Sequence, residues 1–168
     1  MRLPQPHWPQ LLPTRTIVNV ATIGPLGRRT KAPGTWGSLA GLLYFTVAFA
    51  GLGPVGNVLL SALGAWLAVG FCGEAETRLG RSDPGEIVLD EFIAMPLCFV
   101  GWQWLPGAWP NWAVFLAGFG LFRLYDIVKP FGIGRLQRLP GGWGVVADDV
   151  AAALAACATL HVAAALWP

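Results

Sequence analysis

The chain has 168 residues, enough for one domain, and 55% of them are hydrophobic while only 12% are charged. A soluble domain carries about 25% charged residues, so most of this chain is not expected to face water. The formal net charge of +2 is small, and the chain contains no run of basic residues. Nucleic-acid binding is therefore not expected.

Apolar stretches follow one another along the chain, each close to the roughly 20 residues that a membrane-spanning helix requires. The five stretches cover residues 36–52, 55–72, 86–104, 111–127 and 144–167. The first 16 residues hold four prolines and do not resemble a cleavable signal peptide. We therefore predict an all-α fold, a polytopic membrane helix bundle with about five spanning helices.

The charged residues are segregated on this map. With five spans, all eleven Lys and Arg residues fall in the N-terminal segment or in the connections after the second and fourth spans. These segments lie on one side of the membrane, which the positive-inside rule makes cytoplasmic. The N-terminus is then cytoplasmic and the C-terminus outside, or periplasmic. The nine acids follow the same segregation, although the rule does not require it.

The third span opens on a helix-start pattern, Asp83-Pro84-Gly85-Glu86. The pattern predicts a capping box, with Asp83 as N-cap and Glu86 at the third helical position. Asp90 and Glu91 would then lie about two turns into the helix, at the edge of the apolar zone.

Ionisable side chains inside membrane spans are costly and rare, so each is a candidate functional residue. Three clusters of them lie on the charged side: Asp90–Glu91 in the third span, Arg123, Asp126 and Lys129 at the end of the fourth, and Asp148–Asp149 in the fifth. Carboxylates packed this densely repel one another unless cations compensate them. Oxygen ligands of this kind suit Mg²⁺, and the two basic residues could clamp a phosphate. Structural ion pairs are the alternative, and Lys129 could simply snorkel.

A further candidate precedes the first span, in the segment from Lys31 to Ser38. Thr35 or Ser38 could cap the helix, and the free N–H groups at its start could hold an anion. A plain helix cap and turn is the alternative interpretation.

Four strings of this sequence resemble signature blocks of the bacterial phosphatidylglycerophosphatase A family. They are APGTWGSL (residues 32–39), DPGEIVLDEF (83–92), FRLYDIVKP (122–130) and GGWGVVADD (141–149). They occur in the order in which the family has them, and the resemblance covers about residues 18–165. Residues 1–17 are accordingly treated as a leader, and residues 18–168 as a single membrane-embedded phosphatase domain.

The resemblance implies an enzyme with a Mg²⁺ cofactor that converts phosphatidylglycerophosphate to phosphatidylglycerol and inorganic phosphate. This reaction is the last step of phosphatidylglycerol synthesis. It further implies a multi-pass protein of the bacterial inner membrane that takes its phospholipid from the inner leaflet, with the active site on the cytoplasmic side. The sequence does not indicate an oligomeric state.

The matched blocks also suggest a role for each candidate residue. The metal ligands would be Asp90, Glu91, Asp148 and Asp149, and the catalytic set Asp126, Asp90, Glu91 and Asp149. The substrate phosphate would be bound by Arg123 and Lys129, together with Thr35, Ser38 and Lys31. Asp126 is a candidate general base, or a nucleophile that forms an aspartyl-phosphate; the sequence does not choose between them.

Two other functions fit parts of the pattern. A phosphatase of another lipid phosphate would need the same chemistry. A small ion-coupled transporter also places carboxylates in membrane helices, but usually near the midplane. The outer half of every predicted span lacks charge, which argues against a transporter.

Overall fold

The computed structural model describes residues 4–105 and 109–167, and every regular element in those ranges is a helix. In chain order they are η1 (Trp8–Leu11), α1 (Thr14–Ala21), α2 (Pro25–Arg29), α3 (Pro33–Ala48), α4 (Pro54–Leu79), α5 (Leu89–Ala94), η2 (Met95–Phe99), η3 (Trp102–Trp104), α6 (Asn111–Val128), η4 (Pro130–Arg138) and α7 (Gly142–Leu166). The predicted all-α fold is confirmed.

Three helices in the described part of the chain are long and apolar enough to cross a membrane: α4, α6 and α7. At 1.5 Å per residue they are about 39, 27 and 38 Å long. Local sequence explains the limits of α4. Pro54 occupies its first turn, where the missing N–H costs nothing, and Gly80 ends it in a left-handed conformation with φ of 64°.

The other two predicted spans have no such helix. Helix α3 has 16 residues and is about 24 Å long, which is shorter than the roughly 30 Å hydrocarbon core. The prediction of one continuous helix over residues 86–104 is wrong, because this stretch breaks into α5, η2 and η3. Pro96 cannot donate a backbone hydrogen bond, and Gly101 turns the chain with a φ of 71°. Five membrane passages therefore remain a prediction.

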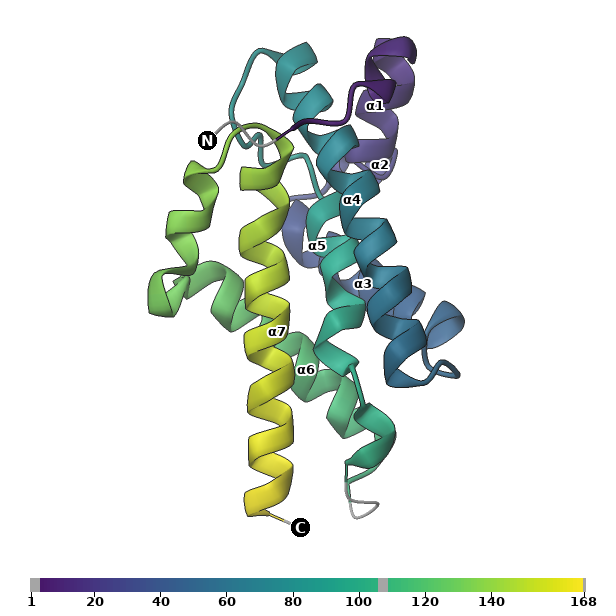
Figure 1. Ribbon diagram of the computed structural model, residues 1–168, viewed down its shortest axis with the longest axis vertical. Coiled ribbons are helices and arrows are strands. Elements are labelled where there is room, and N and C mark those ends of the chain that lie inside the picture. Colours follow the sequence, from purple (N-terminus) through teal and green to yellow (C-terminus); the bar gives the residue numbers. More distant parts are fainter. Residues whose placement is uncertain (1–3, 106–108, 168) are drawn as a thin grey trace.

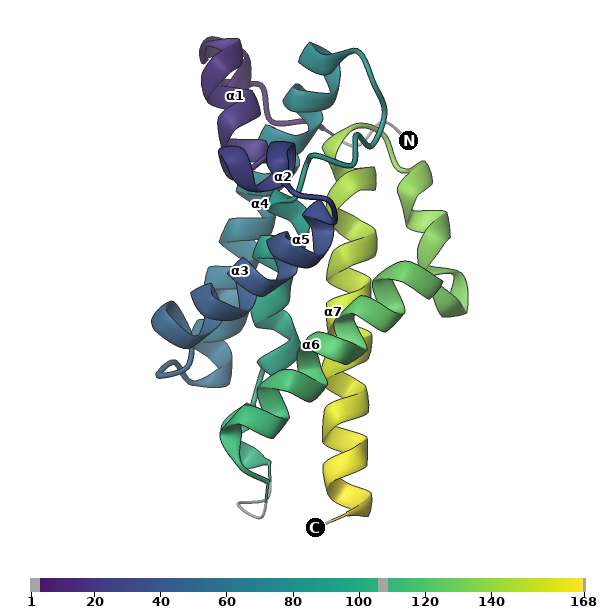
Figure 2. The same ribbon diagram turned by 180° about the vertical axis from the view of Figure 1, so that it is seen from behind.

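The long helices set the shape of the molecule (Figure 1). Helices α4 and α7 run along its long axis, and α6 crosses α7 obliquely, as the reverse view also shows (Figure 2). The end of α4, the start of α7 and the small helices α1 and α2 gather at one end of the molecule. The short α5 lies in the interior between the long helices.

Two apolar clusters make up the core. The cluster near the start of α7 comprises Ile17, Ala21, Ala68, Val69, Cys72, Ala75, Ile87, Leu89, Val145 and Val146. The larger cluster comprises Phe45, Phe49, Ala94, Met95, Leu97, Cys98, Phe99, Val114, Phe122, Ala152, Ala153, Ala156 and Leu160. Both α5 and α7 pass from one cluster to the other, and their acidic residues fall between the two. The polar site is thus enclosed by apolar packing along both helices.

Candidate functional site

The loop between α4 and α5 determines where the first acidic pair lies. Asp83 has a left-handed backbone with φ of 46°, and its N–H donates to Glu76 Oε1 at 2.5 Å. Glu86 is paired with Arg81 instead of reaching back toward the backbone of Asp83. Helix α5 begins only at Leu89. The predicted capping box is therefore wrong, and the acidic pair lies in the first turn of a short helix.

Three carboxylates from α5 and α7 meet inside the protein. One oxygen from each of Asp90, Glu91 and Asp149 lies within 4.8 Å of the other two. Asp90 is 6% exposed and Asp149 is 4% exposed. We call these three residues the acid triad. Helices that are far apart in sequence thus bring together three of the four residues predicted to hold a metal.

The fourth, Asp148, faces a different neighbour. Its Oδ2 accepts a hydrogen bond from Lys129 Nζ, and the side chain is buried. Successive residues of an α-helix point about 100° apart, and here Asp149 faces the triad while Asp148 faces Lys129. The structure places Asp148 beside the triad as the partner of a cation.

The end of α6 supplies two cations on either side of one carboxylate. Asp126 Oδ2 accepts a hydrogen bond from Arg123 Nη1 at 2.7 Å, and its Oδ1 lies 3.5 Å from Lys129 Nζ. Arg123 Nη1 is also 3.9 Å from Glu91 Oε1. We call Arg123 and Lys129 the cationic pair. The predicted stripe at helical spacing is present and borders the acid triad.

Lys129 ends α6 in a left-handed conformation with φ of 48°. Burial lowers the pKa of this side chain, but the hydrogen bond to Asp148 and the charges of Asp148, Asp126 and Asp149 outweigh it. The pKa of Lys129 is therefore raised above its ordinary value. Lys129 stays cationic at neutral pH and remains available to an anion.

The charge balance of the site favours a bound cation. The site contains five carboxylates and two cationic groups, so three negative charges are uncompensated when all are ionised. Two buried carboxylate oxygens, Glu91 Oε2 and Asp148 Oδ1, have no hydrogen-bond partner. Burying unpaired charge is costly. The acid triad, made of hard oxygen donors, therefore fits a divalent cation such as Mg²⁺.

A cavity of about 120 Å³ opens onto these groups. Its lining consists of Asp83, Gly85, Ile87, Asp90, Glu91, Asp126, Lys129, Gln137, Val145, Asp148 and Asp149. Gln137, from η4, was missed by the sequence analysis; its Nε2 donates to Asp83 Oδ2 at 3.3 Å across the cavity. An exposed glutamine in a basic segment carries no sequence signal of such a role.

The start of α3 reaches the site through Gly34 and Ser38. A Cβ at Gly34 would collide with Glu91 Oε1 and lie 3.3 Å from Arg123 Nη1, so any larger residue here would have to displace the Glu91 carboxylate. Ser38 is buried and its hydroxyl lies 3.3 Å from Arg123 Nη1, which donates to it. Thr35 and Lys31 are exposed and make no recorded polar contact with the site. The predicted cap is wrong, since Ala32 is the N-cap and no side chain caps the helix.

These features define a class of protein. In its described part it is a helical protein with three helices long and apolar enough to cross a membrane, in which a buried carboxylate cluster suited to a cation lies beside Arg and Lys. Comparison with known proteins identifies the class more narrowly. The family model for phosphatidylglycerophosphatase A matches residues 19–164. The chain therefore belongs to the phosphatidylglycerophosphatase A family and is a lipid phosphatase, a phosphoric monoester hydrolase.

Individual relatives agree with the family match. A phosphatidylglycerophosphatase A of Haemophilus influenzae is 37% identical over 129 residues, covering 73% of this chain and 73% of the relative. One from Escherichia coli strain K12 is 32% identical, covering 81% and 76%. A protein of Bacteroides thetaiotaomicron that carries the name "Putative phosphatidylinositol-3-phosphatase" is 35% identical, covering 72% and 76%. No solved structure matches the chain.

Proposed function

We propose that this protein hydrolyses phosphatidylglycerophosphate to phosphatidylglycerol and inorganic phosphate, the last step of phosphatidylglycerol synthesis. The observation that carries the proposal is that the acid triad and Lys129 line one cavity, while Arg123 Nη1 lies 3.9 Å from Glu91 Oε1 of the triad. Two relatives that match most of the chain are named for this activity.

Mg²⁺ is the proposed cofactor, held by Asp90, Glu91 and Asp149. When bound, it supplies positive charge that neutralises the substrate phosphate and polarises its P–O bonds. Asp148 is proposed to act next to this centre, where its Oδ2 accepts from the Lys129 ammonium and holds it in place.

The phosphate monoester is proposed to bind between the acid triad and the cationic pair. Arg123 offers a planar fork of N–H donors to phosphate oxygens, and Lys129 adds a point charge. Ser38, in α3, is proposed to orient the Arg123 guanidinium by accepting a hydrogen bond from Nη1. Lys31 and Thr35, at the exposed start of α3, are proposed to contact the same headgroup as it enters.

Asp126 is proposed to take the proton from the attacking water. The water oxygen bonds to phosphorus as the P–O bond to the glycerol breaks. The glycerol oxygen takes a proton from a solvent water, and Asp126 returns its own proton to solvent. Both Asp126 oxygens accept charge-assisted contacts from Arg123 and Lys129, and a bond from either oxygen to phosphorus would require one of these contacts to break. Each oxygen keeps a lone pair that can accept a proton. We therefore favour a general base over an aspartyl-phosphate.

The protein is proposed to cross the bacterial inner membrane five times, with the N-terminus cytoplasmic and the C-terminus periplasmic. In support, the chain reverses direction along the long axis at each of α3, α4, α5–η3, α6 and α7 (Figures 1 and 2). The end of α4 and the start of α7 lie together at the end that carries Arg78 and Arg81. The acid triad lies nearer this end than the far end of α7, which agrees with a substrate in the inner leaflet.

A second candidate function is the hydrolysis of another lipid phosphate. The Bacteroides relative, whose name refers to a phosphoinositide, motivates it. The site chemistry is the same in both cases, since the triad and the cationic pair would bind any phosphate monoester.

The test is phosphate release by detergent-purified protein, with Mg²⁺ and with EDTA. Phosphatidylglycerophosphate, phosphatidate and phosphatidylinositol-3-phosphate are compared at equal surface concentration. We expect Mg²⁺-dependent release with preference for the first lipid. Preference for another lipid would select the second function, and no release by a folded protein from any of the three would refute both.

A further inference from the structure

The N-terminal segment, residues 4–12, lies outside the family match, which begins at residue 19. It nevertheless packs against the two long helices α4 and α7. In Figure 1 this dark purple segment crosses in front of α4 close to the start of α7. The part of the chain that the resemblance leaves unexplained therefore contacts the helix that carries Asp148 and Asp149.

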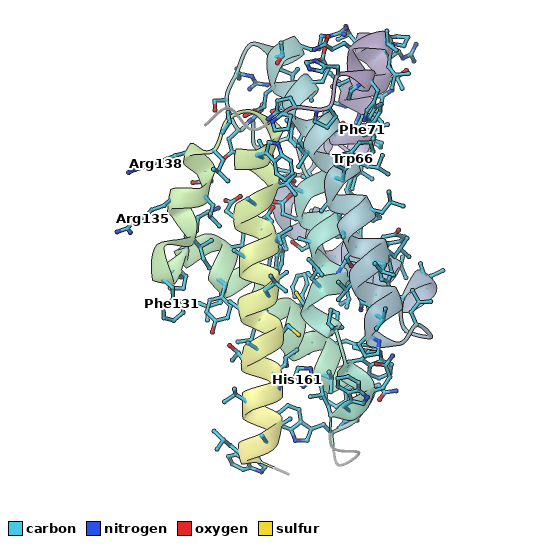
Figure 3. The ribbon with its side chains drawn as sticks, viewed as in Figure 1. Trp66, Phe71, Phe131, Arg135, Arg138 and His161 are labelled. Carbon is cyan, nitrogen blue, oxygen red and sulfur yellow. The ribbon has the colours of Figure 1, made fainter. Side chains whose placement is uncertain are left out.

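On α4 the segment is anchored by aromatic packing. The ring of Trp8 lies 6.1 Å from that of Trp66 and 5.0 Å, edge to face, from that of Phe71. Figure 3 shows Trp66 and Phe71 on α4, on the side where the N-terminal helices lie. Pro9 is buried, and a Cβ at Gly70 would lie 3.1 Å from both Pro9 and Trp8. The side chains of Trp8 and Pro9 therefore pack closely against α4 at Gly70.

At the start of α7 the contacts are polar and directed. Gln5 Nε2 donates to the carbonyl oxygen of Pro140 at 2.7 Å, and Trp143 Nε1 donates to that of Pro4 at 3.1 Å. A Cβ at Gly73 of α4 would lie 2.6 Å from the backbone nitrogen of Gly142 and 3.1 Å from Gln5 Oε1. The first turn of α7 is therefore enclosed between α4 and the Gln5 side chain.

This enclosure fixes the position of α7 along its own axis. Asp148 and Asp149 lie about two turns beyond Gly142. The one glycine in between, Gly144, is itself tightly packed, since a Cβ there would lie 2.5 Å from the carbonyl oxygen of Leu139. A shift of the first turn is then passed directly to both carboxylates. A displacement of about 1 Å can decide whether a site functions.

We propose that residues 4–12 are a positioning element that holds the start of α7, so that Asp149 joins the acid triad while Asp148 meets Lys129. Gln5 and Trp143 are its positioning residues, since they bridge the segment and α7 directly. The proposal concerns metal binding by the triad, and it rests on the proposed function only where turnover is the readout.

The experiment compares Gln5→Ala with a matched control, Gln10→Ala, in the full-length protein in detergent. Gln10 lies in the same segment, and the hydrogen bonds that the described structure gives it are made by its backbone: its N–H donates to the carbonyl oxygen of His7, and its carbonyl oxygen accepts from Arg78. The Mg²⁺ concentration that gives half of the maximal rise in unfolding temperature is measured for each protein, together with the unfolding temperature in EDTA and with turnover. Trp143→Phe, which keeps the ring and loses the donor, is the second variant.

We expect Gln5→Ala to raise the Mg²⁺ concentration for half effect about fivefold, the factor that one lost hydrogen bond of ordinary strength gives. Trp143→Phe should act in the same direction, and Gln10→Ala should match the unsubstituted protein. Unchanged Mg²⁺ affinity in both variants, with only a lower unfolding temperature in EDTA, would show a purely structural segment and overturn the proposal.

The positioning role of residues 4–12 and the proposed function can be refuted independently of each other. If the unsubstituted protein released no phosphate from any lipid while Mg²⁺ affinity still depended on Gln5, the positioning role would stand and the proposed reaction would fall. If turnover were Mg²⁺-dependent and neither Gln5→Ala nor Trp143→Phe changed the Mg²⁺ affinity, the proposed reaction would stand and the positioning role would be overturned.

Discussion

The first turn of α5 and the second turn of α7 each carry two adjacent acids, but the structure uses the two pairs differently. In α5 both Asp90 and Glu91 join the acid triad, because the Glu91 side chain is longer and its N–H donates to Asp90 Oδ1 at 3.1 Å. In α7 only Asp149 does so, and Asp148 turns to Lys129. Two adjacent acids in a sequence therefore do not define one site; the element that each faces decides its role.

The comparison has an energetic consequence. The triad gathers like charges with little local compensation, and Arg123 is 3.9 Å from the nearest of them. Asp148, in contrast, is paired with a cation. Removing a triad carboxylate should relieve repulsion in the absence of metal, while removing Asp148 should break an attraction. The signs of the stability changes therefore distinguish the two kinds of acid.

The largest effect is expected for Asp149→Asn. The variant loses one metal ligand, and turnover should fall about a thousandfold or more, as for groups that stabilise transition-state charge directly. The rise in unfolding temperature with Mg²⁺ should disappear, while stability in EDTA should be equal or higher. Phosphate release and thermal unfolding in detergent, with and without Mg²⁺, measure both.

Asp90→Asn is the parallel variant from α5 and should behave in the same way. Full activity of either variant would remove that residue from the site. A loss of activity with an unchanged response to Mg²⁺ would contradict the proposed metal ligands.

A smaller loss is expected for Asp126→Asn, about a hundred- to a thousandfold, the range of general-base catalysis. Asn keeps the size of the side chain but cannot accept a proton at neutral pH. Because Asp126 lies outside the triad, the effect of Mg²⁺ on unfolding should be retained. A phosphorylated enzyme trapped from labelled substrate in rapid-quench experiments would contradict the general-base role and identify Asp126 as a nucleophile.

The sequence predicted the all-α fold class, and it predicted charged residues that the structure brings close together. Costly charges in apolar stretches mark candidate positions without any structure, so Asp90, Arg123 and Asp149 could be found. The strings that resemble the family's signature blocks then predicted that these residues belong to one site. The long helices α4 and α7 followed from apolar runs bounded by proline and glycine.

Other features depended on tertiary structure. The capping box at Asp83 failed because Glu86 pairs with Arg81, a contact made by the folded loop. The continuous third helix failed at Pro96, which the length of the apolar run concealed. The contacts of Gln5 and Gln137 join segments more than 50 residues apart, and no local pattern marks them.

Asp148→Asn tests the acid that is paired with a cation instead of joining the triad. It weakens a charge-assisted contact to Lys129 beside the metal centre, and turnover should fall about tenfold, within the range for residues that orient a metal site. The unfolding temperature should fall in both EDTA and Mg²⁺, opposite to Asp149→Asn in EDTA. Lys129→Met combined with Asp148→Asn completes a double-mutant cycle, and additive effects on stability would contradict the pair.

The smallest effect concerns the support of Arg123 from α3. Ser38→Ala removes the hydroxyl that accepts from Arg123 Nη1 at 3.3 Å. One lost hydrogen bond to a charged group costs about 1.5 kcal/mol or more, so kcat/KM should fall about tenfold. Thr35→Ala, one turn earlier and exposed, is the matched comparison and should change kcat/KM less than Ser38→Ala does, since it would lose only a contact with the incoming headgroup. A larger effect at Thr35 would mean that the start of α3 binds substrate directly and that Arg123 needs no support from behind.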